Sequence, residues 1–389
     1  MTGIDLSGKT VLFLVTEDWY FRSHRLPLGR AARDAGARVV VAARMRADRA
    51  AIEAEGFTAI DIPFDRSGLD PVSDWGTLRA IVSAYRRVRP DIVHHVGLKP
   101  VLYGSLTHRR AKVPVIVNAM AGMGFVFTAE SGAARLLRAG VVPALRWLNG
   151  RRGTGVIVQN DDDRRLLTDI VGIDESRITI IRGSGVDISA FAPTPEPGGQ
   201  PVAVCVSRML WHKGIGELVE AARLLKARGV PLTVRLVGPT DANPASIPQA
   251  DLDAFAAEGI VEVTGPTRDV AGAYAGAHIA VLPSYREGLP KSLLEAAACG
   301  RPMVATDVPG CREICLHHET GLLVPPRAPV ALADALEELA RDAALRARLG
   351  ANARRLVVAE LADTAVAAQT LDLYRRLLHK IEAAGATAG

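Results

Sequence analysis

Ile279-Ala-Val-Leu-Pro-Ser-Tyr-Arg-Glu-Gly-Leu-Pro-Lys-Ser-Leu-Leu-Glu295 is the stretch that says most about how this 389-residue chain folds. Its first four residues are apolar and predict a short buried strand. Gly288 then allows the backbone to approach a ligand closely, and Pro290 suits the first turn of a helix. A buried strand, a short loop and a helix form one step of a parallel α/β sheet. Ligands of such sheets bind beyond the carboxyl ends of the strands, so this loop is a candidate binding site.

The first turn of the predicted helix is a candidate phosphate site, because unpaired backbone N–H groups point out of a helix N-terminus. This turn runs from about Leu289 to Ser292. Glu287 precedes the helix, and Glu295 lies about one turn beyond Lys291. A carboxylate repels phosphate, but it accepts hydrogen bonds from the hydroxyl groups of a sugar or a ribose. The segment therefore predicts a site for a sugar that carries phosphate.

A second basic loop follows the predicted strand Val202–Val206. In it, Arg208 and Lys213 bracket a short turn that leads into a helix from Gly214. A forked guanidinium and a point ammonium make a clamp for a diphosphate, whose charge must be stabilised as it leaves. Alone, such a pair is usually an ordinary surface charge pair. The order of the two loops, each directly after a predicted strand, favours one joint site.

Strands and helices alternate along almost the whole chain, which is typical of doubly wound parallel sheets. The alternation stops at residues 187–200, where proline and glycine accumulate and predict a linker. We therefore expect an N-terminal domain at residues 1–186 and a C-terminal domain at 201–362. Residues 363–389 are expected to form a final helix, able to pack back on the N-terminal domain, and a frayed tail.

The composition narrows the class of protein. Apolar residues make up 49% of the chain and aromatic residues 5%, as in α/β cores built from small aliphatic side chains. The net charge of +5 tolerates anionic partners, but no RNA-binding motif or zinc-finger spacing accompanies it, so nucleic acid is not an expected partner. The four cysteines are too few for a disulfide scaffold, so we expect them to be reduced thiols. No signal peptide or membrane-spanning run is apparent, so we expect a cytoplasmic protein, either free or peripheral on the inner face of the plasma membrane.

The two loops also carry a family resemblance. Arg208 and Lys213, the Glu287-x7-Glu295 pair, Gly265 between them and the block from Glu295 to Thr306 resemble the retaining glycosyltransferases of family 4. The resemblance implies the GT-B fold, in which two Rossmann-like doubly wound parallel-sheet domains face each other across a cleft. It implies that Arg208 and Lys213 bind the diphosphate, Glu287 the donor sugar and Glu295 the ribose, with no cofactor. The implied catalytic residues are Glu287, Arg208 and Lys213, and the implied donor-binding residues add Gly288, Leu289, Pro290, Lys291, Ser292 and Glu295.

The N-terminal half matches this family less tightly. Residues 16–25 lack the G-x-G-x-x-G pattern of dinucleotide-binding proteins. Their Ser23-His24-Arg25 element instead resembles a subgroup that acts on surface polysaccharides and lipid-linked oligosaccharides. Many family members place a histidine after the strand Val113–Val117, and residues 118–124 of this chain contain none. The candidate acceptor-binding residues are Trp19, Tyr20, His24, Arg25, His94, Lys99 and Gly122. For His24, and for His94 with its neighbour His95, a structural role is an equal alternative.

The segment Ala133–Arg152 mixes leucine, valine and tryptophan with five arginines in an amphipathic pattern. Such a helix can dock on anionic lipid headgroups, or it can turn its apolar side to the core with arginine in water. The residues alone leave both alternatives open. The resemblance implies an acceptor linked to polyprenyl diphosphate and favours the membrane.

A metal site is not expected. The cluster Cys311, Cys315, His317 and His318 lacks the spacing of zinc sites. No Asp-x-Asp motif follows a strand, and the three aspartates from Asp161 are typical of a helix start. We therefore expect transfer that does not depend on metal.

The predicted function is transfer of a hexose or N-acetylhexosamine from a nucleoside diphosphate sugar, with uracil as the base by resemblance. The predicted acceptor is a glycan linked to polyprenyl diphosphate, and the anomeric configuration is retained. Two alternatives stay open. The first is a nucleotide-sugar epimerase on the same fold, and the second is a binding subunit without turnover.

Overall fold

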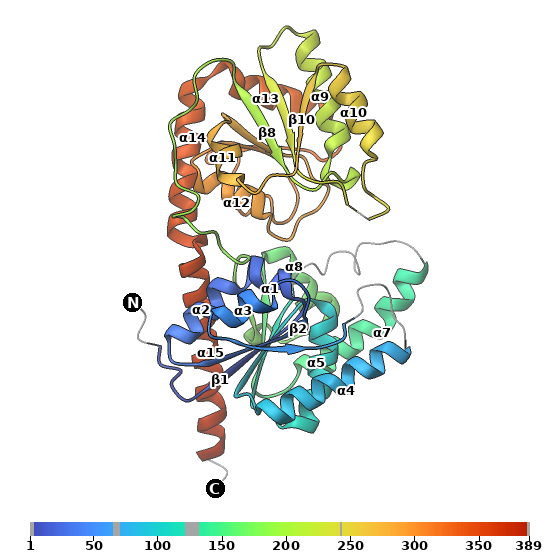
Figure 1. The fold of residues 1–389 in the computed structure, drawn as a ribbon, viewed down its shortest axis with the longest axis vertical. Coiled ribbons are helices and arrows are strands. Elements are labelled where there is room, and N and C mark those ends of the chain that lie inside the picture. The colour runs from blue at the N-terminus through green and yellow to red at the C-terminus, as the bar shows by residue number, and fades with distance from the viewer. Residues whose placement is uncertain (1–3, 65–70, 121–131, 242, 387–389) are drawn as a thin grey trace. The chain divides into compact units, whose positions relative to one another are not determined.

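The computed structural model describes residues 4–64, 71–120, 132–241 and 243–386. The chain divides into two compact units (Figure 1). Unit 1 consists of Met1–Ser184 together with Asp363–Gly389, and unit 2 consists of Gly185–Ala362. Each unit is built around its own parallel sheet.

The sheet of unit 1 has seven strands in the order β3-β2-β1-β4-β5-β6-β7, and every neighbouring pair is parallel. The central strands are almost wholly buried, because helices cover both faces of the sheet. The strands are β1 (Thr10–Glu17), β2 (Arg38–Arg44), β3 (Thr58–Asp61), β4 (Ile92–Val96), β5 (Val115–Ala119), β6 (Thr154–Val158) and β7 (Ile178–Ile180).

Two helical layers cover this sheet. On one face, α2 (Leu26–Asp34) and α15 (Asp363–Ala386) pack on the odd-numbered residues of β1, and α15 lies beside α2 in Figure 1. On the other face lie α4 (Pro71–Val88), α5 (Leu98–Ala111) and α7 (Gly132–Asn149). The remaining helices of unit 1 are α1 (Asp18–His24), α3 (Arg49–Ala54), α8 (Asp161–Arg165), η1 (Leu166–Val171) and η2 (Glu175–Arg177).

Unit 2 repeats the design with six parallel strands in the order β10-β9-β8-β11-β12-β13. Its strands are β8 (Val202–Val206), β9 (Thr233–Val237), β10 (Val261–Gly265), β11 (Ile279–Leu282), β12 (Met303–Thr306) and β13 (Gly321–Val324). Its helices are η3 (Trp211–Lys213), α9 (Ile215–Ala227), α10 (Gln249–Ala257), α11 (Val270–Ala275), α12 (Lys291–Ala298), α13 (Pro329–Arg341), α14 (Ala343–Leu356) and η4 (Val357–Leu361).

The segment at residues 187–200, for which the sequence predicts a linker, belongs to unit 2. Three arginines hold it there: Arg354 donates to the Phe191 carbonyl at 3.0 Å, Arg301 donates to the Thr194 hydroxyl at 2.6 Å, and Arg346 pairs with Glu196 at 2.9 Å. Proline and glycine exclude regular secondary structure, but they do not exclude side-chain contacts to a neighbouring helix.

The helix α7 resolves part of the question that its amphipathic sequence left open. Val141, Leu145 and Leu148 are buried and face the sheet, whereas Arg146 and Trp147 are exposed. Over residues 140–149 the apolar stripe therefore belongs to the core of unit 1. Among the described residues, no helix combines the length and hydropathy needed to cross a bilayer.

Candidate active site

Loops at the carboxyl edge of the unit 2 sheet touch one another through glycines. The Gly214 Cα faces the loop after β11, and a Cβ built on it would lie 2.0 Å from the Pro283 carbonyl oxygen. A Cβ on Gly310, after β12, would lie 2.3 Å from the carbonyl oxygen of Gly288. Both glycines have positive φ, +73° and +81°, which side-chain-bearing residues rarely adopt. The loops after β8, β11 and β12 are thus packed backbone to backbone.

This packing joins the two sequence motifs. The Lys213 ammonium donates a hydrogen bond to the Glu287 carboxylate, and their side chains are only 17% and 12% exposed. The loops are fixed by a second layer of bonds: the Tyr285 N–H donates to the His212 carbonyl at 3.0 Å, and the Ser284 hydroxyl donates to the same oxygen at 3.2 Å. One positive and one negative group therefore stand side by side where a charged sugar phosphate would need both.

Arg208 stands in the same loop as Lys213 and is paired differently. Its guanidinium lies 2.6 Å from the Asp241 carboxylate, which follows β9, and its side chain is 49% exposed. An exposed ion pair contributes little to stability, so exchanging Asp241 for a phosphate partner would cost little.

Glu295 lies inside α12, and the residue is 8% exposed. Burial raises the pKa of its carboxyl, and the Lys291 ammonium, 3.6 Å from Oε1, opposes the shift. The helix begins at Lys291 with Pro290 as its N-cap, so it starts about two residues later than the sequence predicts, and Leu289 and Pro290 lie before its first turn. Gly288 and Leu289 precede this turn and Ser292 lies inside it, where the Ser292 carbonyl accepts a hydrogen bond from the Tyr274 hydroxyl at 2.7 Å.

Two further groups of this edge were not predicted from the sequence. His212 precedes Lys213 directly, and its pKa is lowered by burial and then by the charge of Lys213. Tyr285 donates to Glu217 at 2.5 Å, and the Arg327 guanidinium lies 4.7 Å from the centre of its ring. His212 and Tyr285 belong to the two loops that the sequence analysis describes. No sequence pattern distinguishes them, and only their contacts in the structure do.

In unit 1, the predicted acceptor residues of α1 lie just after β1. Trp19 is 42% exposed, and the Tyr20 ring stacks on the His24 ring with centroids 4.4 Å apart. Arg25 is buried, and its Nη1 lies 3.4 Å from the Gly183 carbonyl oxygen. The Arg25 Nε is buried without a hydrogen-bond partner among the described residues. A buried cation with one unpaired donor suits an anionic or hydroxyl-rich ligand.

The other predicted acceptor-binding residues do not lie with those of α1. His94 on β4 is 1% exposed, and its Nδ1 forms a 2.6 Å hydrogen bond with the Tyr374 hydroxyl of α15. His95 is equally buried and bonds Tyr85 and Asn118. The burial of His94 favours the structural alternative that the sequence left open: its side chain belongs to the core of unit 1, because a parallel strand covered on both faces buries every residue.

Lys99, at the start of α5, lies 3.8 Å from the Asp74 carboxylate of α4. Gly122 lies outside the described residues. Cys311 and Cys315 are buried thiols in unit 2, and burial raises the pKa of both. Among the described residues, no group of three or more His, Cys, Asp or Glu side chains is arranged to hold a metal ion.

The fold defines a class of protein. Solved GT-B glycosyltransferases share this fold: one from Rickettsia africae has a TM-score of 0.78 at 17% identity, covering 95% of this chain and 99% of that one. The Anabaena protein HepE in complex with UDP has a TM-score of 0.76 at 17% identity, covering 94% of this chain and 100% of that one. At these identities the likeness concerns the fold alone. The GT-B fold predicted from the sequence is confirmed.

Sequence comparisons give the family. Residues 24–189 match the family model described as Glycosyltransferase Family 4, and residues 200–342 match Glycosyl transferases group 1. The chain belongs to glycosyltransferase family 4.

Two relatives are similar over most of their length. The first is an N,N'-diacetylbacillosaminyl-diphospho-undecaprenol alpha-1,3-N-acetylgalactosaminyltransferase of Campylobacter jejuni, 27% identical over 84% of this chain and 88% of the relative. The second is a D-inositol 3-phosphate glycosyltransferase of Kineococcus radiotolerans, 31% identical over 74% of this chain and 71% of the relative.

Proposed function

We propose that this glycosyltransferase moves a hexose or N-acetylhexosamine from a UDP-sugar to a glycan linked to polyprenyl diphosphate, with retained configuration and without a metal ion. The Lys213–Glu287 pair at the carboxyl edge of unit 2 carries the proposal. It supplies a cation for the diphosphate and a carboxylate for the sugar hydroxyls at adjacent positions.

The donor would be held by three sets of groups. Lys213 and Arg208 take the diphosphate, the N–H groups of the first turn of α12 face the same charge, and Glu295 accepts the ribose hydroxyls. The Anabaena protein HepE, which shares the fold, is described in complex with UDP, which supports uracil as the base.

Transfer then needs little beyond charge stabilisation. The acceptor oxygen forms its bond to the anomeric carbon on the face that the diphosphate leaves, and the bond from that carbon to the phosphate oxygen breaks. The leaving diphosphate keeps the electron pair and takes the acceptor proton. Lys213 and Arg208 offset the negative charge that develops on it.

The acceptor assignment rests on unit 1 and on the Campylobacter jejuni relative, whose name states a diphospho-undecaprenol-linked acceptor. The buried Arg25 guanidinium at the C-cap of α1, whose Nε has no hydrogen-bond partner among the described residues, fits an anionic glycan or a diphosphate.

The test combines binding and turnover. Thermal-shift measurements against UDP, GDP and ADP should give the largest rise in melting temperature with UDP, because a ligand stabilises a protein in proportion to its affinity. Turnover is then followed as UDP release from UDP-N-acetylglucosamine, UDP-N-acetylgalactosamine, UDP-glucose and UDP-galactose, with and without a polyprenyl-diphosphate-linked glycan and with and without EDTA.

We expect UDP release only in the presence of acceptor and no loss of activity with EDTA. NMR of the product should show the same anomeric configuration as in the donor sugar. A changed free nucleotide sugar formed without acceptor would identify an epimerase. Nucleotide binding without release under any of these conditions would identify a binding subunit.

A further inference from the structure

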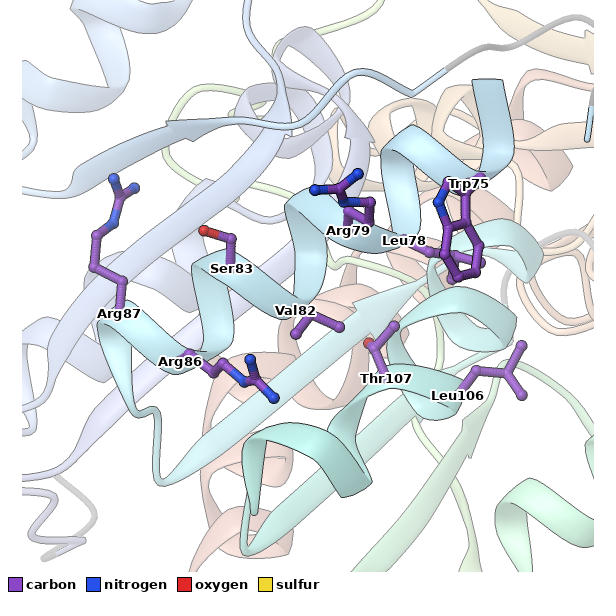
Figure 2. Close-up of a pocket in the computed structure, with 9 residues that line it drawn as sticks. All are labelled: Trp75, Leu78, Arg79, Val82, Ser83, Arg86, Arg87, Leu106 and Thr107. Atoms are coloured by element: carbon purple, nitrogen blue, oxygen red, sulfur yellow. The ribbon is translucent and has the colours of Figure 1, made fainter. Parts of the chain in front are cut away.

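Basic hollows lie on both faces of the unit 1 sheet. A groove of about 840 Å³ runs between α4 and α5 and is lined by Arg79, Arg86 and Arg87 (Figure 2). On the other face, a pocket of about 280 Å³ lies where the C-terminal half of α15 meets the starts of β6 and β7. We call this smaller hollow the α15 pocket. Its volume is at the small end for a pocket that holds a small molecule.

Four cations from three segments of the chain line the α15 pocket. The strands β6 and β7 pair in parallel, so the residues that precede them lie near each other at the amino edge of the sheet. Arg152 and Arg177 hold these positions. Arg376 and Lys380 are four residues apart on α15, and this spacing puts both side chains on one side of the helix. Strand pairing and helix periodicity therefore gather the four charges.

A glycine leaves room between these groups. Gly155, near the start of β6, lines the pocket and packs against α15. A Cβ built on it would lie 2.9 Å from the Leu377 Cδ1 atom, so a larger residue would displace the helix. Leu377 and Ile381 supply an apolar wall, and Thr179 on β7 adds a hydroxyl group to the lining. The pocket thus offers space, cations and a neutral hydrogen-bonding group.

The charge of the α15 pocket has one sign. None of its lining residues, all of which the structure describes, carries a carboxylate. The exposed Asp174 lies outside the lining. Hydrogen bonds from Ser176, followed by the charges of Arg177 and Lys380, lower the pKa of its carboxyl. Both cations therefore already act on an anion that reaches them from solvent.

Two of the four cations are held in place. The Arg177 Nη1 donates a hydrogen bond to the carbonyl oxygen of Arg151. The Arg376 Nε lies 3.1 Å from the Asp372 carboxylate of the same helix. A guanidinium that is already fixed loses less side-chain entropy when it binds an anion.

We propose that the α15 pocket binds a small soluble ligand through a diphosphate group. A single phosphate carries at most about two negative charges at neutral pH, so four cations match a diphosphate better. Arg177 and Arg376 would donate to its oxygens through their forked guanidiniums, and Arg152 and Lys380 would close the rim.

The α15 pocket is separate from the proposed reaction site. It lies at the amino edge of the unit 1 sheet, whereas α1 follows the carboxyl end of β1 and the donor loops belong to unit 2. Binding there needs neither the donor sugar nor the acceptor, and it would fix α15 against β6 and β7.

The first experiment is calorimetric titration of the whole chain with sodium pyrophosphate at constant ionic strength. The test variant is R152Q/K380Q, because both residues are exposed and their replacement leaves the core intact. The matched control is R33Q/R49Q, which removes the same charge from exposed arginines of α2 and α3.

We expect the test variant to bind pyrophosphate about 30-fold more weakly than the wild type, because each charge removed beside an anion in water costs about fivefold in affinity. The control should change the affinity by less than about twofold, since salt screens distant charges. A test variant that binds like the wild type, or equal losses in test and control, would overturn the proposal.

The donor edge offers a competing diphosphate site, so the variant R208Q/K213M is titrated in parallel. Pyrophosphate binding should survive in this variant. Its complete loss would place the pyrophosphate at the donor edge and overturn the proposal for the α15 pocket. The UDP thermal-shift assay is independent of this outcome, so the two proposals are judged separately.

Vesicles that contain phosphatidylglycerol distinguish a lipid phosphate from a soluble one. We expect the wild type and R152Q/K380Q to co-sediment with them equally. Weaker co-sedimentation of R152Q/K380Q, together with no heat from pyrophosphate in the wild type, would show that the pocket binds a lipid headgroup and would overturn the assignment of a soluble ligand.

Discussion

The Lys213 ammonium is bonded to the Glu287 carboxylate, although 74 residues separate them in the sequence. The loops after β8 and β11 bring them together, and each charge neutralises the other. A bound diphosphate would give Lys213 a second anionic partner and turn Glu287 towards the sugar. The pair therefore links the phosphate and sugar parts of the proposed site.

Replacing either member should remove turnover. We expect Lys213→Met and Glu287→Gln each to lower kcat/KM by roughly 10²–10³-fold, the usual loss when one preorganised electrostatic group is removed. Circular dichroism should show folded protein in both cases. The exposed Glu220→Gln on α9 is the control and should keep its activity. Unchanged activity in Glu287→Gln would refute the donor-site assignment.

We expect the Glu295 carboxylate to lower the stability of the folded protein and to strengthen UDP binding. Because burial raises the pKa of its carboxyl, the folded state holds the proton more tightly than the unfolded state. Ionised Glu295 therefore lowers the free energy of unfolding at pH values above the raised pKa. This loss of stability disappears as the pH falls through the raised pKa. We expect Glu295→Gln to raise the melting temperature at neutral pH and to weaken UDP binding by roughly 10–100-fold, the loss of a hydrogen bond to a charged acceptor.

A thermal-shift titration with UDP measures both effects of Glu295→Gln. The control is Glu338→Gln on an exposed position of α13, which should change neither. A variant that loses stability and keeps its affinity for UDP would show that Glu295 is a structural residue.

We expect that Gly310 cannot be replaced without disturbing the neighbouring loop after β11. A Cβ at this position would meet the Gly288 carbonyl oxygen at 2.3 Å, so Gly310→Ala should displace the donor loop and weaken UDP binding at least tenfold. Gly259→Ala is a matched control: its φ is also positive, +63°, but nothing lies within 4 Å. That control should lose only about 1 kcal/mol of stability through backbone strain and keep its affinity. Equal affinities in the two variants would contradict the packing of these loops.

His94 should affect the pH dependence of stability rather than turnover. Burial, followed by the charges of Arg25 and His95, holds the pKa of His94 well below its usual 6.5. The unfolded state therefore binds a proton that the folded state refuses, and stability is lost as pH falls below about 6.5. His94→Asn should lower stability by about 1–3 kcal/mol, because Tyr374 loses its partner. It should also remove up to about 1.4 kcal/mol per pH unit from the slope below pH 6.5.

Urea unfolding between pH 5 and pH 8 gives that slope (roughly the range over which histidine titrates). The control is His379→Asn, whose side chain is 70% exposed on α15 and should leave the slope unchanged. A slope in His94→Asn equal to that of the wild type would show that His94 takes up its proton in the folded protein.

The position of the proposed donor residues, in loops after strands of the unit 2 sheet, could be predicted from sequence because its information is local. A buried strand, a glycine and a helix start each leave a short-range pattern, and the carboxyl ends of parallel strands meet at one edge. Arg208, Lys213, Glu287 and Glu295 follow from these patterns and from the family to which the chain belongs. The partner of Arg208 did not follow, since Asp241 lies 33 residues from Arg208 and no local pattern connects them.

The sequence by itself therefore determined the fold class and the family, and it supplied the residues of the proposed donor site. The tertiary structure decided the rest: that His94 is buried against Tyr374, that residues 187–200 are fixed to unit 2, and that α4 and α5 leave a basic groove. These features depend on which faces of distant elements pack together. Periodicity shows that a helix has an apolar side, but burial of that side, and exposure of Trp75 on the other, is settled only by the neighbour against which the helix packs.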